Sequence, residues 1–201
     1  ASALAAVLVL LAGPAAAAGG KADQPFDPFG VAGIDRIEGA RAPLDAALTD
    51  ETGRSVTLRT LAHGKPIVLA PVQHRCPNLC GFTLEGLVHA VRTQPYSPGA
   101  DFEIVALGFD PKETPKDAEV SAERLRSRLD PGAARAGVAA LVGPAAKAIT
   151  DALGYRYAWD PRIGQYAHVA AFAVLTPDGR LARWIYGIQP EGSDLRLALT
   201  E

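Results

Sequence analysis

Two cysteines, Cys76 and Cys80, are the only thiols in this 201-residue chain, and three residues separate them. Cysteines four positions apart lie about one helical turn from each other, so a helix would direct both sulfurs to the same side. This spacing suits a disulfide, and it also suits two thiolates on one soft metal ion. Thioredoxin-type exchange usually has two residues between its cysteines, so the wider spacing favours the metal.

A metal held by two thiolates needs a further ligand, and the chain has four histidines. His168 stands just before a predicted strand, where an imidazole could face the two sulfurs; the alternative is a half-buried histidine bonded to a backbone carbonyl. His74 is close to Cys76, as a ligand or as a group behind the ligands, although an extended loop would direct it elsewhere. His63 and His89 are expected at the surface. Two thiolates and one imidazole suit Cu(I), and Cu(II) with an added oxygen.

The elements that must position these residues follow from the hydrophobic pattern. Residues 67–72 (IVLAPV) form a continuously apolar run, which is typical of a strand buried on both faces. The cysteines come next, and apolar residues at helical spacing then predict a helix. Further elements are expected at 102–109 (strand), 115–129 (helix capped by Thr114), 138–141 (strand), 144–153 (helix), 155–159 (strand), 169–175 and 180–186 (hairpin), and from Ser193 (helix).

This order predicts an α/β protein with a thioredoxin-like fold, a β-α-β-α-β-β-α core. An N-terminal β-hairpin (44–48 with 55–58) precedes the core, and an insertion precedes the C-terminal hairpin. In this fold the loop that carries the two cysteines (residues 73–80, the cysteine loop) lies at the carboxyl end of a central strand. The loop bearing His168 is expected to pack against it. Pro77 suits a first helical turn, so Cys76 is the expected N-cap, and the helix dipole with Arg75 would favour its thiolate.

Composition bounds the function. A net charge of −2 with interspersed charges argues against a nucleic-acid partner, and two cysteines are too few for a disulfide scaffold. Residues 1–18 are apolar and uncharged, as in a signal peptide or membrane anchor truncated at its start. We expect a linker at 19–43 and one domain at 44–201. The domain would then be exported, and the cysteines would meet an oxidising compartment.

Four motifs resemble the Sco/SenC family of copper-binding, thioredoxin-fold proteins. They are, in order, Cys76-Pro77-x-x-Cys80, the segment 109–115 (FDPKETP), Tyr166-Ala167-His168 and the segment 176–180 (TPDGR). The family's usual Gly-Phe-Thr before the first cysteine is Gln-His-Arg here, and Asn78 and Gly81 also depart from its pattern. These departures indicate a divergent branch.

The resemblance implies that Cys76, Cys80 and His168 bind copper. It further implies a metallochaperone that delivers copper to the binuclear copper site of cytochrome c oxidase, or reduces the thiols of that site. Its partner would be the copper-receiving oxidase subunit or a related assembly factor, at the periplasmic or extracytoplasmic face of the cytoplasmic membrane. The main alternative is an exported thiol–disulfide oxidoreductase, with Cys76 attacking and Cys80 resolving. Peroxide reduction and a non-catalytic assembly scaffold are further alternative functions. Asp110 is expected to be a turn residue, with a position near the site as the alternative.

Overall fold

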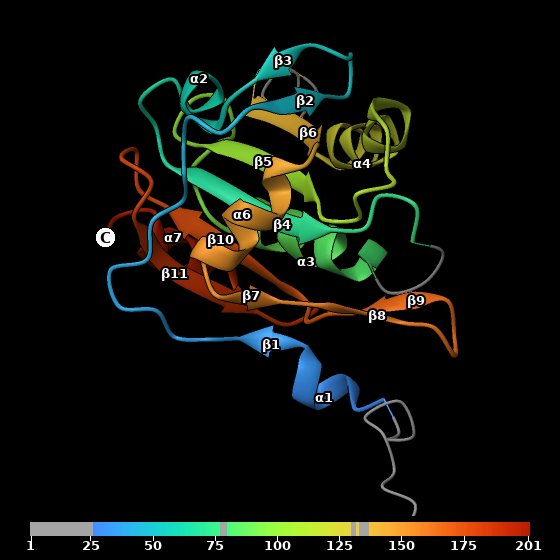
Figure 1. Cartoon of the computed structure of the whole chain (residues 1–201). Helices are drawn as coiled ribbons and strands as arrows, with labels where there is room; N and C mark the ends of the chain where they lie inside the picture. Colours follow the sequence, from blue (N-terminus) through green and yellow to red (C-terminus); the bar gives the residue numbers. More distant parts are fainter. Residues whose placement is uncertain (1–25, 77–79, 130–131, 133–136) are drawn as a thin grey trace, which may run out of the picture.

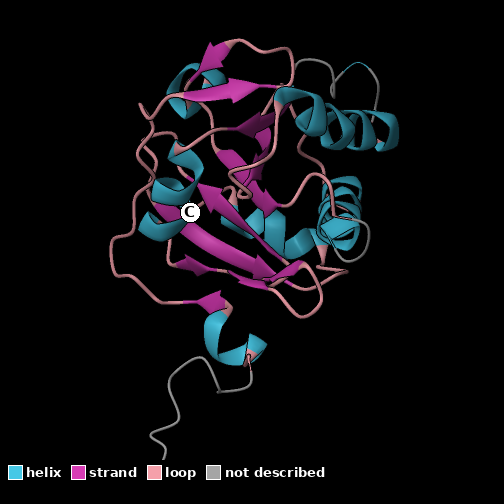
Figure 2. Cartoon of the chain, turned by 45° about the vertical axis from the view of Figure 1, so that its right-hand side comes forward, coloured by secondary structure: helices cyan, strands magenta, loops and turns pink. Residues whose placement is uncertain are grey.

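A mixed sheet of seven strands, with helices on both faces, organises the computed structural model, which describes residues 26–76, 80–129, 132 and 137–201 (Figures 1 and 2). The N-terminal half of the chain contributes α1 (Pro28–Val31), β1 (Gly33–Ile34), β2 (Leu48–Asp50), β3 (Ser55–Val56), α2 (Leu58–Ala62), β4 (Ile67–Val72), α3 (Cys80–Arg92) and β5 (Glu103–Gly108). The C-terminal half contributes α4 (Pro115–Arg128), β6 (Val138–Val142), α6 (Ala145–Ala152), β7 (Tyr155–Arg156), β8 (Ala158–Asp160), β9 (Gln165–Ala167), β10 (Ala171–Leu175), β11 (Leu181–Tyr186) and α7 (Gly192–Ala198).

The main sheet has the strand order β11-β10-β4-β5-β6-β2-β3. Strands β4 and β5 are parallel and are joined through α3, as the crossover rule predicts. Strand β10 runs antiparallel to β4 and forms a hairpin with β11. The predicted thioredoxin-like order is therefore confirmed, and β4, the strand that ends at the cysteine loop, lies in the middle of the sheet.

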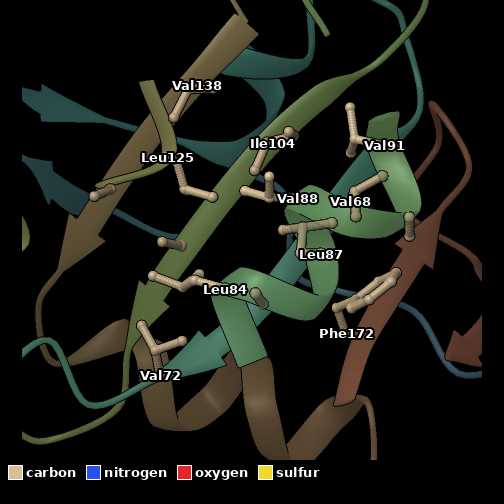
Figure 3. Close-up of a cluster of buried hydrophobic side chains, with 14 of the residues drawn as sticks. Val68, Val72, Leu84, Leu87, Val88, Val91, Ile104, Leu125, Val138 and Phe172 are labelled. Atoms are coloured by element: carbon tan, nitrogen blue, oxygen red, sulfur yellow. The ribbon is translucent and has the colours of Figure 1, made fainter. Parts of the chain in front are cut away.

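The core has two layers because successive residues of the buried strands face opposite sides of the sheet. Val68, Ala70 and Val72 of β4 face one layer, and Ile67 and Leu69 face the other. Figure 3 shows the first layer, where α3 directs Leu84, Leu87, Val88 and Val91 toward the strands. Helices α4 and α7 complete this layer, while α2 and α6 cover the opposite face. Burial on both faces explains why β4 reads as an unbroken apolar run.

Helix α4 begins as the sequence predicts. Thr114 is its N-cap, and Pro115 occupies the first turn, where the missing N–H costs nothing. Asp117 accepts hydrogen bonds from the backbone N–H and the hydroxyl of Thr114, both at 2.7 Å. This cap fixes the loop between β5 and α4, which lies beside the cysteine loop.

The structure adds detail in two segments of the prediction. The insertion before the last hairpin contains the predicted strand 138–141, which is β6 and pairs with β5 as a parallel strand of the main sheet. The predicted linker 19–43, where it is described from residue 26 onward, packs on the domain: β1 pairs with β7, and Ala40 and Ala42 are buried. The sequence does not reveal this packing, because small residues such as alanine can be buried in narrow gaps without forming the long apolar run that indicates a core element.

Within the described ranges, no helix is both long and apolar enough to cross a bilayer. The predicted signal or anchor at 1–18 lies outside the described residues.

Candidate functional site

The cysteine loop follows β4 directly. The backbone N–H of Cys76 donates to the carbonyl of Gln73 at 3.2 Å, so the chain turns at once after the strand. Cys76 is partly exposed, and helix α3 begins at Cys80. Residues 77–79, and with them the predicted Pro77 helical turn, lie outside the described residues, as does the side chain of Cys80.

The buried carboxylate of Glu113, in the loop between β5 and α4, holds the start of the cysteine loop through a hydrogen bond. Oε1 of Glu113 accepts a hydrogen bond of 2.8 Å from the backbone N–H of Arg75. Glu113 is only 8% exposed, and its Oε2 has no hydrogen-bond partner among the described residues. Burial is the largest cause that raises the pKa of Glu113, to about 7; the Arg75 amide opposes it, and Asp110 and Asp117 add to it. A proton-binding group therefore lies directly behind the cysteine loop.

His168 lies between β9 and β10, where the sequence predicts it. Its Nδ1 is 3.2 Å from the carbonyl oxygen of Val169 and 3.2 Å from the hydroxyl of Tyr155. The ring meets Phe109 at 5.2 Å between centroids, in an edge arrangement. Burial lowers the pKa of His168, and its bond to the Val169 carbonyl opposes that shift. The imidazole is therefore neutral at neutral pH, which is the form that binds metals.

Cys76 and His168 line the same cavity, of about 430 Å³, although they are far apart in the sequence. The remaining walls come from α1 and from the β8–β9 hairpin, and most of them are apolar. They comprise Pro28, Phe29, Ala32, Asp160, Arg162, Ile163, Gln165, Tyr166, Ala167 and Val169. A sulfur and an imidazole thus share one largely apolar space.

Residues 26–35, here called the N-terminal strap, form one wall of this cavity. Helix α1 contacts β8 and β9 (Figure 1). Arg162 donates to the carbonyl of Phe26 at 3.1 Å, and its guanidinium lies 5.2 Å from the centre of the Phe26 ring. Arg156 donates to the carbonyl of Gly30 at 2.9 Å and pairs with Asp35. Two arginines thus fasten the strap to the domain.

Comparison with solved structures gives matches over most of the chain. A candidate electron transfer protein from Aquifex aeolicus VF5 matches with a TM-score of 0.67 and 26% identity, over 80% of this chain and 91% of that one. ScoI of Arabidopsis thaliana, solved with copper bound, matches with a TM-score of 0.61 and 18% identity, over 81% and 96%. The chain has the fold of the Sco proteins.

BsSco matches with a TM-score of 0.57 and 17% identity, over 83% of this chain and 95% of that one. BsSco belongs to the Sco family of cytochrome c oxidase assembly proteins, and a disulfide switch was identified in it. No family model matches the sequence, and a search of curated proteins finds no match. The likeness to Sco proteins is therefore one of fold, at low sequence identity.

His74 has a structural role in this version of the Sco fold. It is 7% exposed; its Nε2 is 3.1 Å from the Leu141 carbonyl, and its Nδ1 is 2.8 Å from the Ser121 hydroxyl. Burial lowers the pKa of His74, so the neutral ring donates from Nε2 and accepts at Nδ1. Neither partner lines the cavity that contains Cys76, so His74 is directed elsewhere, as the sequence analysis expected of an extended loop. A Cβ at Gly108 would lie 2.6 Å from its ring, so this packing requires glycine.

The other polar candidates behave largely as expected. His63 and His89 are exposed. Asp110 is a turn residue, since it accepts from the backbone N–H of Lys112 at 3.0 Å, and it also accepts from the side chain of Gln73 at 3.2 Å. Asp110 therefore links its turn to the start of the cysteine loop.

The predicted three-residue metal site stays a prediction. Among the described residues, no three His, Cys, Asp or Glu side chains converge on a point that could hold a metal ion. The predicted set includes Cys80, whose side chain is not among those described. The structure brings Cys76 and His168 to one cavity and leaves the third member untested.

Two residues next to the site escaped the sequence analysis. Glu113 lies inside the FDPKETP motif, and a glutamate in a polar turn gives no signal of burial. Tyr155 is fully buried beneath His168, yet in the sequence it is one aromatic residue of an ordinary strand. Only the pairing of distant segments places these side chains beside the site.

Proposed function

We propose that this chain is a divergent Sco/SenC protein, a copper metallochaperone that binds the metal through Cys76, Cys80 and His168. The observation that carries the proposal is the cavity shared by Cys76 and His168. Thiolate sulfur and neutral imidazole suit Cu(I), and two sulfurs with one nitrogen leave room for an incoming ligand. The copper-bound ScoI structure of the same fold supports the choice of metal.

The receiving partner in this proposal is the copper-binding subunit of a cytochrome c oxidase, or a related assembly factor. The apolar cavity walls suit an acceptor that presents its thiolates on an apolar surface, because water would be excluded while the metal changes ligands. The exchange would take place outside the cytoplasm, at the membrane, as the apolar segment 1–18 suggests.

A thiol–disulfide oxidoreductase is the second candidate, favoured by the spacing between Cys76 and Cys80, the residue at which α3 begins. In this role the reduced pair would attack a partner disulfide, form the Cys76–Cys80 disulfide and release two partner thiols. His168 would then be incidental to the chemistry. The disulfide switch of BsSco, which has the same fold, supports keeping this candidate.

Copper stoichiometry tests the proposal. The reduced full chain is expected to bind one Cu(I) per molecule, in competition with a calibrated chelator, because two thiolates and one imidazole form a single soft site. The Cys76→Ser, Cys80→Ser double variant is expected to bind none at the same chelator concentration. Equal copper content in the two proteins would refute the metal role and leave the thiol chemistry as the better account.

A further inference from the structure

Three polar groups meet around one ring nitrogen of His168. Nδ1 lies 3.2 Å from the Tyr155 hydroxyl and 3.2 Å from the Val169 carbonyl oxygen, and the hydroxyl lies 2.7 Å from that same carbonyl. The three atoms form a closed triangle. Each side of the triangle is a hydrogen-bonding distance, so the positions of the protons are constrained.

The Val169 carbonyl can only accept hydrogen bonds, whereas a tyrosine hydroxyl has one proton to donate. The distance between the Tyr155 hydroxyl and the Val169 carbonyl oxygen, 2.7 Å, is the shortest of the three, so the hydroxyl donates its proton to that carbonyl. Nδ1 therefore faces two oxygen atoms that offer it no proton. These contacts are favourable only if Nδ1 carries its own hydrogen, which it can share between the two oxygens.

The opposite tautomer conflicts with this arrangement. A lone pair on Nδ1 would face a lone pair of the Val169 carbonyl at 3.2 Å. The Tyr155 hydroxyl would have to give up its 2.7 Å bond to donate to Nδ1 instead. Since the buried ring is neutral, one nitrogen must lack a proton, and this geometry makes that nitrogen Nε2.

We propose that Tyr155 is a positioning residue for His168: together with the Val169 carbonyl, it holds the imidazole as the Nδ1–H tautomer and so makes Nε2 the ligand nitrogen. The assignment of the tautomer stands on the hydrogen-bond geometry of the neutral ring, while its use in copper binding rests on the function proposed above. A metal-binding imidazole normally donates its other N–H to a fixed acceptor, which sets the orientation of the ring.

The packing around Tyr155 keeps its hydroxyl in place. The residue is 1% exposed, and its ring stacks on Trp184 with 5.5 Å between centroids. The Trp184 indole N–H in turn donates to the Leu153 carbonyl at 3.1 Å. Phe109 touches both Tyr155 and His168. The Tyr155 ring is therefore held between aromatic neighbours, so its hydroxyl has a fixed position from which it can orient the His168 imidazole.

The tautomer can be measured directly. Nitrogen-15 NMR of the reduced, metal-free full chain, at about pH 8 where imidazole is neutral, distinguishes Nδ1–H from Nε2–H. The His168 signals are assigned by their absence in a His168→Gln variant. We expect Nδ1–H for His168 in the wild type and a larger share of Nε2–H in Tyr155→Phe. An Nε2–H imidazole in the wild type would overturn the inference, whether or not copper binds.

Tyr155→Phe also tests the consequence for copper, with Tyr157→Phe as its matched control. Tyr157 lies two residues away and stacks on Phe109 at 4.4 Å, and its hydroxyl donates to the Phe109 carbonyl at 3.4 Å rather than to His168. We expect Tyr155→Phe to weaken Cu(I) binding about tenfold, the lower end of the range for groups behind metal ligands, and Tyr157→Phe to leave it unchanged. Equal losses in both variants, or no loss in Tyr155→Phe, would refute the positioning role. A wild type that binds no copper would refute the proposed function, and the NMR result would still decide the tautomer.

Discussion

Replacing His168 with alanine is expected to weaken Cu(I) binding by at least about 100-fold, roughly 2.7 kcal/mol. The reason is that one of three ligands is lost and that, among the described residues lining the cavity, no other imidazole can take its place. The Cys76–Cys80 disulfide is expected to form as before, because His168 takes no part in sulfur–sulfur bonding. Competition with a copper chelator measures the affinity, and thiol titration after oxidation measures the disulfide.

The matched control for this change is His89→Ala. His89 is an exposed histidine on α3, so its loss removes an imidazole without touching the cavity. Copper affinity in this variant should equal that of the wild type. If His168→Ala also retained wild-type affinity, the three-ligand site would be excluded, and the oxidoreductase would become the preferred function.

The free energy of unfolding of the wild type is expected to fall as pH rises, because of Glu113. Replacing Glu113 with glutamine is expected to abolish this part of the pH dependence. The pKa of Glu113 is raised to about 7 by burial, whereas an unfolded glutamate titrates near 4.3. Between these two values the folded protein holds a proton that the unfolded chain has lost, so the free energy of unfolding falls as pH increases. The full difference is on the order of 3 kcal/mol across this window.

Urea unfolding at about pH 4 and about pH 8 measures this effect. Glutamine is neutral at both values, so the stability of Glu113→Gln relative to the wild type should rise by that amount from the lower to the higher pH. This comparison between two pH values cancels any constant cost of packing the amide. Glu119→Gln, which changes an exposed carboxylate on α4, should show no such trend. A parallel pH dependence in Glu113→Gln and the wild type would show that Glu113 is ionised in the folded protein at pH 5.

The elements of the sheet were predictable because their patterns are local. The run 67–72 reads as a doubly buried strand and is β4, and the apolar spacing from Leu84 to Val91 reads as a helix and lies within α3. Thr114 and Pro115 mark the start of α4 by capping chemistry alone. Because sequential strands joined by a helix are parallel, the central topology followed from this order.

The surroundings of the site were not predictable, because they depend on contacts between distant segments. The N-terminal strap resembles a linker in composition, and it is ordered by Arg156 and Arg162, more than a hundred residues further along the chain. The hydrogen bond between Glu113 and the Arg75 amide joins segments that are 38 residues apart. The role of Tyr155 depends on a hydroxyl direction that hydrophobic periodicity does not encode. Sequence motifs identified the candidate ligands, and the structure supplied the groups that orient them.

X-ray absorption spectroscopy of the reduced full chain loaded with one Cu(I) tests most directly whether the imidazole and the two thiolates meet on a single ion. The account predicts two sulfur ligands and one nitrogen ligand, with the outer-shell scattering of an imidazole ring that disappears in His168→Ala. Two or more sulfurs without imidazole scattering in the wild type would contradict it.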